Sequence, residues 1–134
     1  MRRTALIVLR MAHSATSLGA AFADATASKD YARMAELLHP EVDFRALTPN
    51  RFWQANDPDT VIDEVLKAWI EPDEHVEELI SVETDAVSDR ERVGYRYRLR
   101  SPDGSFLVEQ QAFFHGRDGR IDWMRLVCSG SRPL

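Results

Sequence analysis

Apolar residues recur at helical spacing in the first half of the chain and alternate with polar residues in the second half. Two apolar stripes come first, formed by Leu18, Ala21, Phe22 and Ala25 and then by Tyr31, Met34, Ala35 and Leu38. Ser28-Lys29-Asp30 separates the stripes and offers a helix N-cap, and His39-Pro40 ends the second helix. The pattern therefore predicts two helices before residue 39, followed by a short alternating strand over residues 42–46.

A third helix is predicted between two proline-containing signals. Asp57-Pro58-Asp59 combines a capping acid with proline in the first turn, and Glu71-Pro72 stops the helix. Its apolar side consists of Val61, Ile62, Val65, Leu66, Trp69 and Ile70. Residues 47–56 read as a loop, whose Phe52 and Trp53 we expect to fold over the core or over a cavity mouth.

Period-two alternation then predicts four strands, over residues 76–86, 92–100, 106–115 and 121–128. Helices followed by an antiparallel meander indicate an α+β fold, in which the helices cover one face of a curved sheet.

The hairpin around Ser101-Pro102-Asp103-Gly104 decides which side chains face the helices. A three-residue Pro102-Asp103-Gly104 loop places Tyr97 opposite Glu109 and Tyr95 opposite Gln111 on one face. The other face then carries Arg92, Arg96, Arg98, Arg100, Phe106, Val108, Ala112 and Phe114. A two-residue Asp103-Gly104 loop exchanges the partners and moves Glu109 to the arginine face, because a slip of one residue reverses a strand.

The next hairpin, at Arg117-Asp118-Gly119, adds candidate chemistry. A two-residue loop sets Asp122 opposite His115, and a four-residue loop sets it opposite Phe113. In both cases Asp122 shares the face of Gln111 and His115. The predicted catalytic residues are His115, Asp122, Glu109, Tyr97 and Gln111, and the predicted pocket lining is Phe22, Trp53, Trp69, Tyr95, Phe113 and Met124.

These residue types suit acid–base chemistry. A histidine oriented by a carboxylate can take up a proton near neutral pH. If Glu109 faces a cavity, desolvation raises its pKa and fits it for the same task. The alternatives are that His115 and Asp122 form a solvated pair at the hairpin rim, and that Glu109 forms an ion pair with Arg98 on the outer face.

Composition narrows the classes of protein. The 134 residues are 44% hydrophobic and 29% charged, which indicates one folded globular domain. The net charge of −5 argues against nucleic-acid binding. Cys128 is the only cysteine, so no intramolecular disulfide forms, and a cytoplasmic location is expected. The histidines have no metal-site spacing, and no cofactor is expected.

The N-terminus is expected to be a flexible extension over residues 1–11, ahead of a single domain over residues 12–134. Its apolar run over residues 5–9 is interrupted by Arg10, which disfavours a signal peptide, and initiation at Met1 or Met11 is left open. No run approaches the roughly 20 apolar residues of a membrane span, so no membrane partner is expected.

With these elements in this order, the chain resembles the nuclear transport factor 2-like superfamily, and more closely its SnoaL-like branch. The resemblance covers nearly all of residues 12–128 and rests on residues 30–45, the helix over residues 57–70, and the hairpin over residues 113–127 with its Asp118-Gly119-Arg120-Ile121 turn. It implies a cystatin-like cone: a strongly bent, mainly antiparallel mixed sheet wrapped as a barrel around three N-terminal helices, with a cavity inside.

The resemblance also implies function. Members include ketosteroid isomerases, polyketide cyclases, dehydratases, epoxide hydrolases and non-enzymatic binders. The isomerase base falls on Ala46, or on Arg45 after a shift of one residue, and the isomerase's second acid falls on Gln111. The chain is therefore not expected to be a standard ketosteroid isomerase. The acid and histidine of the cyclases have possible counterparts in Asp122 and His115.

The family commonly forms homodimers through the outer sheet face, which in this chain is too apolar for open water. We expect Arg96, Arg98, Val108, Phe114 and Trp123 to form this contact.

Two functions remain open. The first is a cavity protein that binds a small, mostly apolar or polycyclic molecule, with cofactor-independent proton transfer, cyclisation or hydration as its chemistry. The second is a non-catalytic ligand-binding or dimeric scaffold protein of the same fold.

Overall fold

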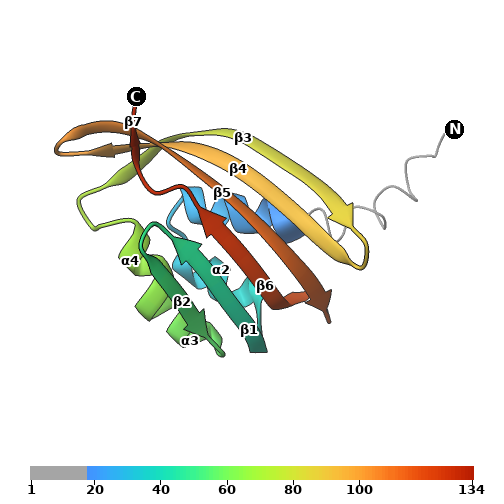
Figure 1. Cartoon of the computed structure of the whole chain (residues 1–134). Coiled ribbons are helices and arrows are strands. Elements are labelled where there is room, and N and C mark those ends of the chain that lie inside the picture. The colour runs from blue at the N-terminus through green and yellow to red at the C-terminus, as the bar shows by residue number, and fades with distance from the viewer. Residues whose placement is uncertain (1–17) are drawn as a thin grey trace, which may run out of the picture.

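A curved sheet packed against a layer of helices makes up the α+β structure (Figure 1). The computed structural model describes residues 18–134; the predicted extension over residues 1–11 and its two candidate start residues lie outside this range. The helices are residues 18–27, α2 (Tyr31–Leu37) and a composite helix of α3 (Pro58–Thr60), η1 (Val61–Leu66) and α4 (Lys67–Trp69). The strands are β1 (Leu38–Thr48), β2 (Arg51–Ala55), β3 (His75–Val87), β4 (Arg90–Ser101), β5 (Gly104–Arg117), β6 (Arg120–Cys128) and β7 (Arg132–Pro133).

The helix starts are those that the sequence predicts. The Asp30 carboxylate accepts a hydrogen bond from the Arg33 backbone N–H at 3.1 Å, and Asp57 accepts one from the Thr60 N–H at 2.9 Å. The Thr60 backbone and hydroxyl hydrogen bonds lower the pKa of Asp57. The composite helix contains a π-helical segment, η1, that buries Val61, Ile62, Val65 and Leu66 against the sheet.

The sheet is mixed, with the order β2-β1-β6-β5-β4-β3, and β7 pairs with β5. β1 and β6 run parallel, whereas the other neighbours along this order are antiparallel. The four strands of the predicted meander are confirmed. β2 corrects the expectation of a loop over residues 47–56: Asn50 adopts a φ of 66° in a tight turn, and Thr48 pairs directly with Arg51.

The predicted register of the first hairpin is wrong. Ser101 pairs with Gly104, so that Tyr97 lies opposite Val108 and Arg96 lies opposite Glu109. The loop consists of Pro102 and Asp103. It has two residues, as the alternative prediction had, but it begins one residue earlier than the Asp103-Gly104 loop of that alternative. The reversed faces have a physical reason: this register places apolar side chains of β5 under the helices, whereas the predicted one would bury a carboxylate.

The second hairpin departs from prediction through a β-bulge. Arg117 pairs with Arg120, as a two-residue loop requires, but Gly116 pairs with Ile121 and His115 pairs with Trp123. Asp122 is the extra residue, and beyond it the pairing of β6 with β5 is shifted by one residue relative to the prediction. Because the faces of β5 are themselves reversed, Met124 and Leu126 still face the interior, as predicted, whereas Asp122 does not. Met124 consequently lies opposite Phe114, and Cys128 lies opposite Gln110. The predicted two-residue loop without a bulge would place each of them opposite a residue adjacent to its observed partner on β5.

The core fills the space between the helices and the concave face of the sheet. Its sheet side includes Phe44, Val93, Tyr95, Tyr97, Leu99, Val108, Ala112, Phe114, Met124 and Leu126, each at most 3% exposed. The predicted dimer contact therefore needs correction, because Val108 and Phe114 belong to this core. Among residues 18–134 no helix is both long enough and apolar enough to cross a bilayer.

Candidate functional site

A pocket lies on the concave side, where α4 faces strands β1, β4, β5 and β6. Its volume is about 130 Å³, and its lining is Thr48, Trp69, Tyr97, Val108, Cys128, Gly130 and Ser131. Trp69 and Tyr97 also line a smaller recess beneath the helices, together with Thr26, Tyr31, Met34, Leu66 and Ile70. Trp69 and Tyr97 thus belong to the walls of both spaces.

The chain after β6 forms one wall of the pocket. Gly130 has a φ of +75°, and a Cβ atom on it would lie 2.8 Å from Pro49 Cγ. Glycine is needed here both for the left-handed backbone and for the close approach to the turn between β1 and β2. The Ser129 N–H donates to the Glu109 carbonyl oxygen at 2.9 Å, which fixes this segment to β5.

Buried neutral groups form a hydrogen-bonded chain beside the pocket. The Tyr95 hydroxyl donates to Gln110 Oε1, and Gln110 Nε2 donates to Cys128 Sγ at 3.3 Å. The Gly130 N–H also donates to this sulfur, at 3.4 Å. Gln110 is 2% exposed, so its amide is held between its two partners and away from bulk water.

The two buried tyrosines remain neutral donors. Burial raises the pKa of Tyr95 more than hydrogen bonding by Thr26 lowers it. Burial also raises the pKa of Tyr97, and the nearby Tyr95 and Cys128 add to this shift.

Two neighbouring tryptophans differ in how their indole N–H groups are satisfied. Trp53 and Trp69 meet edge to face at a centroid distance of 6.1 Å. Trp53 Nε1 donates to Thr48 Oγ1 at 2.7 Å. Trp69 Nε1 is buried and has no hydrogen-bond partner within residues 18–134.

Of the predicted catalytic residues, only Tyr97 faces the pocket. Glu109 and Gln111 lie on the outer face of β5, which reverses their predicted orientation. The Arg96 Nε donates to Glu109 Oε2 at 2.6 Å, and both side chains are more than one-third exposed. This is the outer-face alternative for Glu109, with Arg96 in place of Arg98, which pairs with Glu78.

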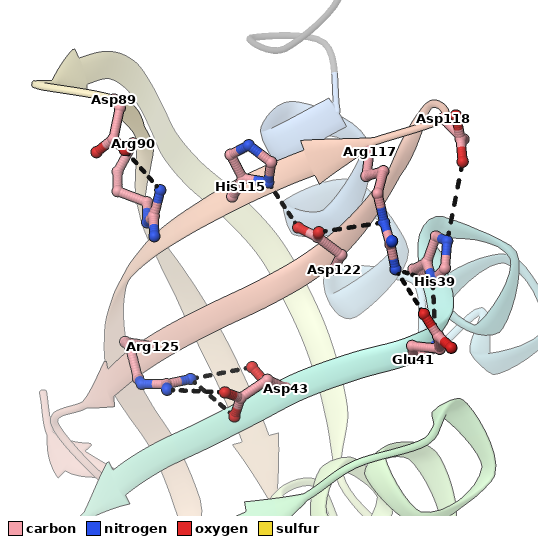
Figure 2. A network of polar contacts seen from close by, with 10 residues as sticks. All are labelled: His39, Glu41, Asp43, Asp89, Arg90, His115, Arg117, Asp118, Asp122 and Arg125. Atoms are coloured by element: carbon pink, nitrogen blue, oxygen red, sulfur yellow. Dashed lines mark hydrogen bonds and ion pairs between the residues drawn. The ribbon is translucent and has the colours of Figure 1, made fainter.

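His115 and Asp122 do meet, but on the outer face of the sheet. His115 Nδ1 lies 2.7 Å from Asp122 Oδ1, and Arg117 Nε lies 3.4 Å from the other carboxylate oxygen (Figure 2). Arg117 continues the network to Glu41 at 2.9 Å, and this ion pair raises the pKa of the guanidinium. The predicted proximity of the pair is confirmed, whereas its predicted place on the pocket face is wrong, because the bulge turns Asp122 outward.

The predicted pocket residues are divided among three places. Trp69 lines the pocket, and Trp53 packs behind it. Phe22, Tyr95 and Met124 are buried in the core. Phe113 corrects the prediction, since it lies on the outer face and pairs with Arg92 and Arg125.

Sequence reasoning missed Gln110, Val108 and Gly130 as parts of the site. The signal for the first two was the alternative hairpin register, in which Val108 shares the face of the tyrosines. Cys128 also lines the pocket and is partly exposed.

No family model matches the chain, and no curated protein matches it in sequence. Solved structures match its fold. An epoxide hydrolase from Mycobacterium tuberculosis, described as LEH-like, is 14% identical with a TM-score of 0.63 and covers 87% of this chain and 83% of its own. A nuclear transport factor 2-like protein of unknown function from Mesorhizobium loti is 20% identical with a TM-score of 0.62, covering 88% and 93%.

A third similar structure is a protein with a ketosteroid isomerase-like fold from Catenulispora acidiphila, in complex with trimethylamine. It is 14% identical with a TM-score of 0.62 and covers 84% of this chain and 85% of its own. The chain therefore has the nuclear transport factor 2-like cone fold that the resemblance implied. At these identities the likeness establishes the fold and leaves the function to the site.

Proposed function

We propose that this chain binds a small, mostly apolar molecule in the concave pocket and does not use the pocket for acid–base chemistry. The observation that carries the proposal is the lining of the pocket and recess. Within residues 18–134 it consists of apolar side chains, neutral polar groups and backbone, with no Asp, Glu, His, Lys or Arg. Apolar walls with a few placed polar groups are typical of small-molecule sites.

The size of the pocket limits the ligand. An apolar cavity of about 150 Å³ accommodates a molecule the size of benzene. The pocket, at about 130 Å³, fits a single ring better than the polycyclic ligand that the sequence left open. Structures with this fold include an epoxide hydrolase and a trimethylamine complex, which supports a ligand role for the cone but does not identify the ligand.

The only cysteine of the chain provides a direct test, because Cys128 lines the pocket. We expect methylcyclohexane to slow the modification of Cys128 by methyl methanethiosulfonate in a saturable manner. Val108→Phe, which fills the pocket, should abolish the protection. Val127→Phe is the matched control, since Val127 is 55% exposed on the opposite face. Unchanged modification rates at saturating methylcyclohexane would contradict the proposal.

A second candidate is proton transfer at the outer face, and the His115–Asp122 hydrogen bond of 2.7 Å favours it. The His115 side chain is 44% exposed, so its second ring nitrogen can be reached by a substrate. Asp122 would orient the ring for proton transfer. Deuterium exchange into the α-carbon of a ketone, followed by NMR, would test this activity. Exchange that His115→Ala abolishes supports it, and a wild-type rate equal to that of buffer rejects it.

We also propose that a second copy of the chain covers the outer face. Phe52, Leu47 and Val127 are adjacent in one cross-strand row and are each more than half exposed. Further along β6 on the same face, Trp123 lies between the guanidinium groups of Arg90 and Arg125, at 4.4 and 4.5 Å. Arg96, Arg98 and Trp123 of the predicted contact remain on this face.

Sedimentation velocity tests the assembly. Val127→Glu should produce a monomer, because it places a charge at one end of the apolar row, directly beside Leu47. The matched control is Val87→Glu, which changes an equally exposed valine at the end of β3 and should leave the dimer intact. A wild-type protein that sediments as a monomer would refute the proposed assembly.

A further inference from the structure

A groove crosses β5 and β6 on the outer face of the sheet, on the side away from the concave pocket. Its volume is about 380 Å³, and its lining is Glu109, Gln110, Gln111, Phe113, Val127 and Ser129. Phe113 and Val127 supply its apolar wall. The carboxylate at its rim is already paired, because Glu109 lies 2.6 Å from Arg96. The groove therefore suits an uncharged, apolar occupant, and it is larger than the roughly 150 Å³ that accommodates a benzene ring.

An aromatic side chain, Phe52, projects from the same face. It is 54% exposed, although a phenylalanine ring is costly to leave in water. Its neighbours in the cross-strand row, Leu47 and Val127, are 52% and 55% exposed. The row continues into the groove, because Val127 pairs with Gln111 on β5. One row of the outer face thus carries an apolar projection on β2 and an apolar groove on β5.

Phe52 cannot fill the groove of its own chain. Strands β1 and β6 separate β2 from β5, so three strand spacings, or roughly 14 Å, lie between Phe52 and Gln111. A second copy can supply the ring. A twofold interface brings the same patch of two copies together, so a projection and a groove on one patch can meet twice. The outer face is self-complementary in this sense.

The row also indicates where the twofold axis passes. Sheets that pack face to face keep their strands within about 30° of alignment, and an axis along the strands reverses the row in the second copy. An axis between β1 and β6 sets Leu47 on Val127 of the partner subunit and Phe52 on Gln111 of the partner subunit, at the groove. An axis over β6 would instead set Phe52 on Gly94, beyond Gln111, and an axis over β1 would leave the groove empty.

We propose that Phe52 of each copy inserts into the outer groove of the other copy, between Phe113 and Val127 of the partner subunit. The inference rests on the proposed covering of the outer face by a second copy, and it adds the side chains that meet. In this arrangement an apolar group covers each of the three exposed apolar side chains of the row. An aromatic ring that fills a groove near the centre of an interface typically dominates the binding energy, so Phe52 is the anchor of the dimer.

Sedimentation velocity over a range of protein concentrations measures the dissociation constant of the dimer. Phe52→Ala should raise this constant at least about tenfold, because a ring is lost from both of the equivalent contacts. Phe52 is exposed within its own chain, so the variant should stay folded, as circular dichroism can show. The matched control is Val87→Ala, at an exposed position on the end of β3, which should change the constant by less than about twofold.

A second measurement needs no substitution. In a mixture of ¹³C-labelled and unlabelled wild-type chains, isotope-filtered nuclear Overhauser spectra report only contacts between copies. The Phe52 ring should contact both the ring of Phe113 of the partner subunit and the methyl groups of Val127 of the partner subunit. Contacts with both residues require the ring to lie inside the groove.

The outcomes separate this inference from the assembly on which it rests. A wild-type dimer whose dissociation constant Phe52→Ala leaves unchanged would overturn the insertion of Phe52 and leave the second-copy assembly standing. The same conclusion follows if the filtered spectra of the dimer lack contacts between Phe52 and Phe113 of the partner subunit. A wild-type chain that sediments as a monomer at every concentration would overturn the assembly, and the insertion with it.

Discussion

Neighbouring substitutions on β5 test the hairpin register on which the site depends. Val108 is 3% exposed and lies opposite Tyr97, whereas Glu109 points outward to Arg96. Val108→Ala removes two methyl groups from the core, worth about 0.8 kcal/mol each in transfer free energy, and leaves a small cavity. We expect a loss of about 2 kcal/mol in the free energy of unfolding.

Glu109→Ala should cost much less. Its ion pair with Arg96 is short at 2.6 Å, but the two side chains are 38% and 57% exposed. Exposed pairs of this kind contribute about 0–1 kcal/mol, because water screens them and both side chains lose freedom in forming them. The two adjacent substitutions should therefore differ by at least about 1 kcal/mol.

Equilibrium urea denaturation measures the difference. With an m-value of about 1–3 kcal/mol/M, Val108→Ala should lower the midpoint by roughly 1 M, and Glu109→Ala by a few tenths of that. In the register expected from a three-residue loop the order is reversed, because Glu109 would be the buried neighbour of Tyr97. A larger effect at Glu109 than at Val108 would refute the register and the pocket with it.

Three further predictions concern stability and pH. Burial raises the pKa of both Tyr95 and Tyr97 above 10.0, so their contribution to stability is complete below about pH 10 and is lost as the pH rises above it; the urea midpoint should start to fall near pH 10 and continue to fall at higher pH. Tyr95→Phe leaves Gln110 Oε1 without its donor and should lower the free energy of unfolding by about 1–3 kcal/mol in the same urea assay, with near-ultraviolet circular dichroism confirming that the variant is folded. Asp57 has a lowered pKa, so its capping contribution is present above about pH 4 and fades as the pH falls; Asp57→Ala should melt earlier than wild type at pH 7, and the two should converge near pH 2.

Much of the fold could be predicted because its signals are local. The helix after Asp57 carries its own cap, its apolar stripe and its proline stop, and the structure follows them closely. The four long strands alternate clearly enough to be placed within a few residues of their observed ends. β2 was not predicted because its five residues form a strand only by pairing with β1. No local pattern in the sequence signals that pairing.

The faces of the sheet could not be predicted in the same way. At the first hairpin, turn preference favoured a three-residue loop, but the difference between turn types is small. Placing Val108 rather than Glu109 under the helices is a larger effect, and it depends on contacts with segments far away in the sequence. At the second hairpin the bulge at Asp122 sits beside the start of the parallel β1–β6 pairing, where the register also shifts, and no turn residue encodes it.

The consequence for function follows from the order of residues on β5. Val108 and Gln110 are separated by Glu109, so a one-residue change of register decides whether the wall beside Tyr97 is neutral or acidic. In the observed register the buried polar residue is an amide that Tyr95 and Cys128 hold in place, and the carboxylate remains in water with Arg96. A neutral amide can orient a ligand but cannot exchange a proton with it near neutral pH. The same hydrophobic burial that sets the register therefore favours recognition of a neutral molecule in the cone, and it leaves His115 and Asp122 to any acid–base chemistry on the other side of the sheet.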